Sequence, residues 1–136
     1  IGREMGERLK RRRTEIAVVD FNPEAIEEAR AAGFTTYFGD VSDVEFLEWL
    51  PLKGAKLVIS TIPNVSDQVL LLRHARRAAP RAALIASVTE RADKQMVYRA
   101  GADYVVMPYL LGADWLAEVV TERRYQRRYF HRLREK

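Results

Sequence analysis

The sequence has no cysteine among its 136 residues. This absence excludes a disulfide framework and thiolate metal sites, and it fits a reducing compartment. No apolar run approaches the ~18 residues that a membrane-spanning helix needs, and no signal peptide is visible. Two histidines are present, and no pair of histidines or carboxylates has the spacing of metal ligands. We therefore expect no metal site.

The composition is that of a globular domain with a sizeable core. Hydrophobic residues make up 48% and charged residues 31% of the chain. The net charge of +4 is uneven, because residues 121–136 carry seven Lys or Arg against two Glu. The rest of the chain is near neutral, which argues against nucleic-acid binding by the whole domain. We expect a domain over residues 1–120 and a basic helical extension over 121–136.

Short apolar runs rich in β-branched residues alternate with helical stretches. The runs are continuous rather than alternating, as is typical of a parallel sheet covered on both faces. They predict strands at 16–19, 35–38, 56–60, 83–87 and 104–107. Helices are expected at 23–32, 43–50, 65–79 and 89–100, with one long helix or two over 110–134. This alternation predicts a doubly wound, Rossmann-like α/β fold with a parallel sheet.

The chain starts with a helical pattern whose second residue is glycine. Gly2 lies 18 residues before Asp20, which closes the strand IAVVD. In a Rossmann unit the third glycine of G-x-G-x-x-G lies in the first turn of a helix. A carboxylate about 20 residues later binds the ribose. We therefore expect Ile1 and Gly2 to be the last two positions of such a loop, with the first strand missing. The structural alternative is an ordinary terminal glycine and an aspartate at a helix cap.

From Ile1 to about Val120 the sequence resembles the RCK N-lobe, or KTN (Trk-N) domain. This family regulates bacterial potassium channels, Trk uptake systems and cation/proton antiporters. The most specific match is the D-x-N-P … G … Y-F-G-D block. The matching segments are IGREMGERL, IAVVDFNPEAIEEARAAGFTTYFGDVSDVEFLEWL, GAKLVISTIPN, LIASVTE and GADYVVMP.

The resemblance implies a nucleotide-sensing regulatory domain rather than an enzyme, with no catalytic residues. By position, Asp20 would accept hydrogen bonds from the adenosine ribose, and Asp40 would lie beside the adenine. Thr61 and Ile62 would line the floor of the crevice, at the carboxyl end of a strand where open α/β sheets bind ligands. The candidate cofactor-binding residues are Gly2, Asp20, Asn22, Gly39, Asp40, Thr61 and Ile62.

The acidic Asp20 favours an unphosphorylated ribose, because it would repel the 2′-phosphate of NADP. NAD(H) or an adenine nucleotide (AMP, ADP or ATP) is therefore the expected ligand. Two departures bear on this expectation. Ser87 and Thr89 stand where the family often has arginine, and the backbone N–H groups of the first two glycines are missing. We expect weak nucleotide binding and marginal stability for the chain as given.

The resemblance implies a membrane-embedded cation transporter or antiporter as partner, at the cytoplasmic face of the cell membrane. It also implies a homodimer through the helix after strand six, LLGADWLAEVV. An alternative function is the cofactor-binding half of an NAD-dependent oxidoreductase.

The basic tail allows three interpretations. Tyr125, Tyr129 and Phe130 alternate with arginines, as in proteins that stack nucleic-acid bases. We favour instead an amphipathic helix whose aromatic side packs on another subunit. Contact with anionic lipid is the third interpretation.

Overall fold

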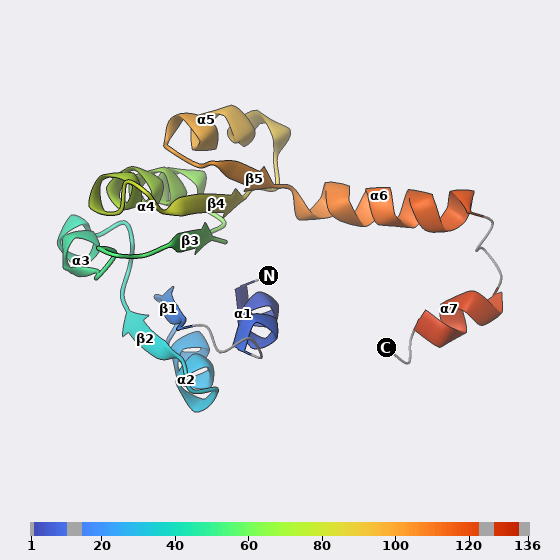
Figure 1. The fold of residues 1–136 in the computed structure, drawn as a ribbon, viewed down its shortest axis with the longest axis horizontal. Helices are drawn as coiled ribbons and strands as arrows, with labels where there is room; N and C mark the ends of the chain where they lie inside the picture. The colour runs from blue at the N-terminus through green and yellow to red at the C-terminus, as the bar shows by residue number, and fades with distance from the viewer. Residues whose placement is uncertain (1, 11–14, 123–126, 134–136) are drawn as a thin grey trace.

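The computed structural model describes residues 2–10, 15–122 and 127–133 (Figure 1). Ile1 and Tyr125, which figured in the sequence analysis, lie outside these ranges. Strands and helices alternate along the described chain, as predicted. In chain order the elements are α1 (Gly2–Lys10), β1 (Ala17–Asp20), α2 (Pro23–Ala31), β2 (Thr35–Phe38), α3 (Val44–Trp49), β3 (Leu57–Ser60), α4 (Val65–Ala78), β4 (Ala83–Ser87), the 3₁₀ turn η1 (Arg91–Asp93), α5 (Lys94–Arg99), β5 (Tyr104–Val106), α6 (Pro108–Thr121) and α7 (Arg127–Leu133).

The strands form two parallel sheets that lie side by side. β1 pairs with β2, with Asp20 opposite Phe38, and β4 lies between β3 and β5 in the second sheet. Within the described residues no backbone ladder joins β1 to β3, which are the neighbouring edges of the two sheets (Figure 1). The order β2-β1, then β3-β4-β5, is the Rossmann order with its first strand left out. The predicted fold class is confirmed.

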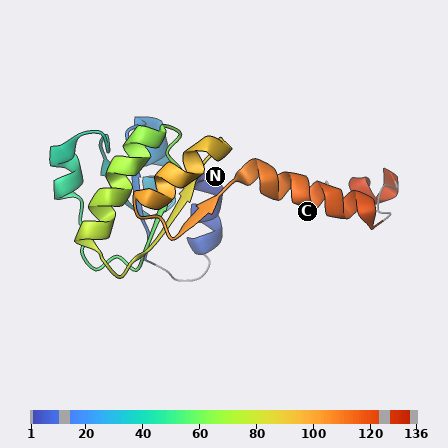
Figure 2. The same cartoon turned by 90° about the horizontal axis from the view of Figure 1, so that it is seen from above.

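Helices cover both faces of the sheets, which is the doubly wound arrangement. α2 packs on β1 and β2, while α4 and α5 pack on the three-stranded sheet from the other side (Figures 1 and 2). α1 lies on the α2 side, where Gly6 faces the ring of Phe34. α6 leaves the end of β5 and projects away from the body as an arm, with α7 beyond it (Figures 1 and 2).

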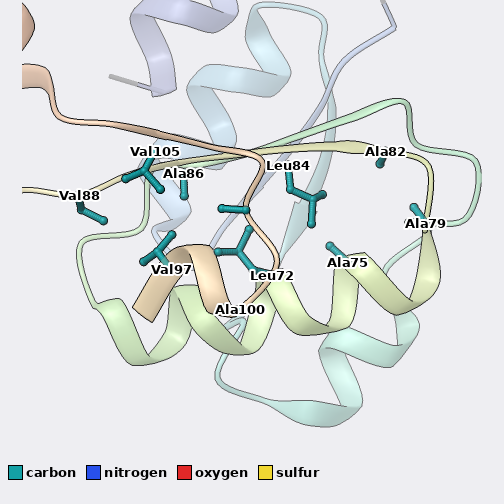
Figure 3. Close-up of a cluster of buried hydrophobic side chains, with 11 residues drawn as sticks. Leu72, Ala75, Ala79, Ala82, Leu84, Ala86, Val88, Val97, Ala100 and Val105 are labelled. Carbon is teal, nitrogen blue, oxygen red and sulfur yellow. The ribbon is translucent and has the colours of Figure 1, made fainter. Parts of the chain in front are cut away.

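The main core lies between α4, α5 and the sheet β3-β4-β5. Leu72, Leu84 and Val97 are fully buried there (Figure 3). Burying a side chain of this size contributes about 1.5–3 kcal/mol. Alanines at positions 75, 79, 82, 86 and 100 let the helices approach the strands closely. This core fixes the position of the carboxyl ends of β3 and β4.

A second apolar cluster joins the two sheets by side-chain packing. It contains buried Val41, Leu47, Leu50 and Leu71, and half-buried side chains from β1, β2, α3 and the loops on either side of β3 pack on it. Those side chains are Val19, Tyr37, Phe46, Leu52 and Ile62. The carboxyl ends of β1, β2 and β3 therefore border one cluster, although β1 and β3 share no ladder.

Helix boundaries follow local chemistry. Asn22 and Asp43 cap α2 and α3 with their side-chain oxygens, and Pro23 occupies the first helical position of α2. Gly33 follows α2 with a φ of 84°, a conformation that glycine adopts without strain. Where one helix was expected over 89–100, a 3₁₀ turn precedes α5.

The region predicted as one long helix or two contains the two helices α6 and α7. No helix within the described ranges combines the length and the hydrophobicity that crossing a bilayer requires.

Candidate functional site

Two carboxylates occupy equivalent positions at the ends of neighbouring strands. Asp20 closes β1, and its Oδ1 accepts the backbone N–H of Asn22 at 2.8 Å. Asp40 follows β2, and its Oδ1 accepts the backbone N–H of Ser42 at the same distance. Each side chain thus uses Oδ1 in a local turn. Asp20 is half-buried and Asp40 is exposed, so neither points into the core.

The pKa of Asp40 lies below its usual value. The main cause is the backbone N–H of Ser42, which stabilises the charged carboxylate, and the Ser42 hydroxyl adds to the effect. Slight desolvation acts in the opposite direction. Asp40 is therefore ionised at neutral pH and suited to accept hydrogen bonds from a ligand.

Asn22 and Gly39 fix the strand ends that carry these carboxylates. The Asn22 side chain caps α2 by accepting the N–H of Glu24 at 2.9 Å, so its oxygen is already engaged. The Gly39 N–H donates to the carbonyl of Asp20 at 3.1 Å, which ties the two strand ends together. A Cβ on Gly39 would lie 2.3 Å from the ring of Phe46. A side chain at position 39 would therefore displace the Phe46 ring, with which α3 packs on the strand end.

The start of α1 reaches the carboxyl end of β3. A Cβ on Gly2 would lie 3.1 Å from Oγ1 of Thr61, which immediately follows β3. Thr61 and Ile62 are half-buried, and Ile62 packs in the same cluster as Val19, the neighbour of Asp20. A helix N-terminus and polar strand ends thus border one region, an arrangement that suits a phosphorylated ligand.

Comparison with known proteins identifies the family. Residues 1–108 match the TrkA-N domain. The chain belongs to the TrkA-N domain family. The resemblance seen in the sequence is therefore confirmed. Probable potassium channel protein 2 of Methanocaldococcus jannaschii is 30% identical to this TrkA-N domain over 122 residues, which cover 88% of the chain and 36% of that protein. The chain thus spans about a third of the length of the curated relatives it matches.

Solved structures agree with the fold. The TrkA-N domain of the inner membrane protein ybaL from Escherichia coli matches with a TM-score of 0.80 at 25% identity, covering 88% of each chain. The GsuK channel bound to NAD matches with a TM-score of 0.68 at 25% identity. That match covers 79% of this chain and 19% of the channel chain.

One buried residue of this TrkA-N domain was missed by the sequence analysis. Gln68 on α4 is 1% exposed, and its Nε2 donates to the carbonyls of Ile62 at 3.2 Å and Ser87 at 3.0 Å. The side chain therefore clamps the loop after β3 to the end of β4. Its signal in the sequence is a polar residue four positions before Leu72 on the core-facing side of a helix.

Two polar atoms beside this clamp remain without a partner in the described residues. They are Oε1 of Gln68 and Oγ of Ser60, and both are fully buried. Ser60 is the last residue of β3, so these atoms lie next to the strand end that carries Thr61. Ser60 and Gln68 are the buried polar residues of the described ranges, so buried polar groups gather at this end of β3.

The two histidines of the sequence lie on helices. His74 is half-buried on α4 and His131 is exposed on α7. Across the described part of the chain, no group of three or more His, Asp or Glu side chains is placed to hold a metal ion.

Proposed function

We propose that this TrkA-N domain binds an adenine nucleotide at the carboxyl ends of β1, β2 and β3, with NAD(H) preferred over NADP. The paired carboxylates Asp20 and Asp40 carry this proposal, because two hydrogen-bond acceptors at neighbouring strand ends match the hydroxyl and amino groups of adenosine. The GsuK channel, solved with NAD bound, is a supporting relative.

Each candidate residue then has a distinct role. Asp20 accepts hydrogen bonds from the ribose through the oxygen that Asn22 leaves free, and Asp40 lies beside the adenine. Thr61 and Ile62 form the floor of the site, next to the start of α1 at Gly2, where helix amides favour phosphate. Asn22 acts indirectly, because its backbone N–H orients the Asp20 carboxylate. Gly39 also acts indirectly, because its N–H ties the end of β2 to the carbonyl of Asp20.

We further infer that the domain regulates a membrane-embedded cation transport protein, for which potassium is the expected ion, at the cytoplasmic face of the membrane. The relatives that support this are a probable potassium channel and an inner membrane protein. They support a regulatory role over the oxidoreductase alternative. Nucleotide would act by population shift, favouring whichever arrangement of domains binds it more tightly.

We also propose that residues 1–120 form the nucleotide-binding domain and that two copies associate through α6. This helix exposes a set of large apolar side chains along the projecting arm (Figure 1). They are Tyr109, Leu111, Trp115, Leu116 and Val120. A group of exposed apolar side chains of this kind is typical of a surface that packs against another protein surface. Leu116→Asp is expected to convert the dimer to a monomer in sedimentation velocity, whereas Asp114→Asn is expected to leave it intact.

Calorimetric titration of the full-length protein with NADH, NAD, NADPH, ATP and AMP tests the nucleotide site. Asp20→Ala should weaken NADH binding by about tenfold or more, the cost of losing a hydrogen bond to a charged group. The same change should weaken NADPH binding less, because removing the negative charge of Asp20 also removes its repulsion of the 2′-phosphate. Glu27→Ala removes an exposed carboxylate from α2 and is the matched control. Equal NADH affinity in Asp20→Ala and Glu27→Ala would contradict the ribose assignment.

A further inference from the structure

Charge is divided between the two ends of the molecule. Residues 15–62, which include β1, α2, β2 and α3, contain nine Asp or Glu against three Lys or Arg. Residues 121–136 contain seven Lys or Arg against two Glu. α3 and α7 lie at opposite ends of the long axis of the molecule (Figures 1 and 2). In this arrangement α7 therefore cannot reach the acidic end of its own chain.

The solvent face of α3 combines carboxylates with exposed apolar side chains. Glu45 and Glu48 are exposed, and Val44 and Trp49 remain 59% and 64% exposed. Pairs three or four positions apart are neighbours on a helix, so these four side chains form one continuous patch. The indole of Trp49 is held by Tyr37, with ring centroids 5.5 Å apart. Within the described residues neither glutamate of this patch has an ion-pair partner.

α7 presents the complementary surface. Arg127, Arg128 and Arg132 are exposed, and Arg128 and Arg132 lie one turn apart on the same face. Beside them, the rings of Tyr129 and Phe130 make an edge-to-face pair with centroids 5.6 Å apart. Guanidinium groups bind carboxylates with two parallel hydrogen bonds and also stack on indole rings. The α3 patch offers both kinds of partner.

We propose that α7 of one copy docks on the α3 patch, Val44, Glu45, Glu48 and Trp49, of a second copy. The arginines of α7 meet Glu45 and Glu48, and a guanidinium or the Tyr129–Phe130 pair covers Trp49. This inference rests on the proposed association of two copies. It adds the surface of the second copy that α7 contacts. An anionic membrane would satisfy the arginines too, but it would leave the acidic and aromatic α3 patch without an occupant.

Reciprocal charge reversal in the full-length protein tests this docking. One variant carries Arg127→Glu, Arg128→Glu and Arg132→Glu, and the other carries Glu45→Lys and Glu48→Lys. Each alone should weaken self-association about tenfold or more in low salt, because an arm then meets a surface of its own sign. An equimolar mixture should restore the wild-type association, because both arm–patch contacts are attractive again between unlike variants. Sedimentation velocity measures both, and 0.5 M salt should reduce the differences.

A matched control reverses three other exposed arginines, Arg73, Arg77 and Arg81, which should leave the association unchanged. Failure of the mixture to restore association would overturn the docking proposal. If all the variants form dimers as tightly as wild type while Leu116→Asp does not, association through α6 stands and the docking of α7 is wrong. Binding to vesicles of phosphatidylserine and phosphatidylcholine tests the lipid alternative. If the wild-type protein is retained on the vesicles, the α7 reversal abolishes this retention and self-association is unaffected, the partner of α7 is a lipid surface instead.

Discussion

The guanidinium of Arg76 donates to Oδ2 of Asp103 at 2.8 Å, and the same carboxylate oxygen accepts the backbone N–H of Leu84 at 2.7 Å. Arg76 also donates to the carbonyls of Pro80, Ala82 and Gly101 at 2.8–3.1 Å. One side chain of α4 thus connects the loop before β4 with the loop before β5. This connection lies at the amino ends of the strands, opposite the proposed nucleotide site.

Replacing Arg76 should therefore lower the free energy of unfolding more than is usual for a partly exposed side chain. Arg76→Ala removes the partners of three backbone carbonyls and of Asp103, which we expect to lower the free energy of unfolding by about 1–3 kcal/mol. Arg77, its exposed neighbour on α4, provides the control, and Arg77→Ala should change stability by less than about 0.5 kcal/mol. Urea denaturation of both variants measures the difference. Equal midpoints would show that the Arg76 contacts contribute nothing.

Stability should also depend on pH through Asp103. Its pKa is lowered, first by the N–H of Leu84 and then by the Arg76 guanidinium, against slight desolvation. A carboxylate with a lowered folded pKa stabilises the fold above its unfolded pKa of about 3.9, and this contribution declines as the pH falls through the folded pKa. The stability difference between wild type and Asp103→Asn should therefore shrink on acidification from pH 6 to pH 3. A difference that stays constant over that range would contradict this role.

Gly39 should not tolerate a side chain. In Gly39→Ala the methyl group would lie within 2.3–2.5 Å of three ring atoms of Phe46, and that ring is itself packed near Trp49. We expect a loss of about 1–3 kcal/mol in unfolding free energy. Gly112→Ala on α6, where nothing lies within 4 Å, should instead be neutral or stabilising by about 0.5–1 kcal/mol. Thermal unfolding of the two variants distinguishes them, and a second change, Phe46→Ala, should make Gly39→Ala nearly neutral.

Gln68 should affect stability and ligand binding together. Gln68→Leu keeps the buried volume but leaves the carbonyls of Ile62 and Ser87 without their donor, at a cost of about 1–3 kcal/mol. Because Ile62 belongs to the floor of the proposed site and Ser87 ends the adjacent strand β4, nucleotide affinity should fall as well. Leu71→Met, a volume-conserving change in the neighbouring cluster, controls for packing alone. A Gln68→Leu variant with reduced stability but full nucleotide affinity would limit Gln68 to a structural role.

The strands and the strand-end carboxylates were predictable from the sequence. Continuous apolar runs such as LVIS and ALIAS mark strands buried on both faces, and an Asp at the end of such a run must lie at the carboxyl edge of the sheet. The division into the sheets β1-β2 and β3-β4-β5 agrees with the expectation that the first strand of the Rossmann unit is missing. The assignment of Gly2, Asp20, Asn22, Gly39, Asp40, Thr61 and Ile62 to a nucleotide site stays a prediction.

Interactions between distant residues were not predictable. Gln68 reaches Ser87 across 19 positions, and Arg76 reaches Asp103 across 27. Nothing local distinguishes either side chain from an ordinary helical residue, since its partners are set by the packing of α4 on the sheet. The cap of α4 is a local feature, because Asn64 accepts the N–H groups of Ser66 and Asp67. Asn64 carried the signal, an N-cap residue followed three positions later by an acidic one.

The lack of a ladder between β1 and β3 affects the free energy that an added strand could contribute. The two sheets contact each other through side chains, so the facing edges of β1 and β3 each keep a row of amide and carbonyl groups that no strand within the described residues pairs with. One parallel strand that paired with both of these edges would complete two ladders while ordering a single segment of backbone. Few other additions to the molecule would yield so many hydrogen bonds for so little lost chain entropy.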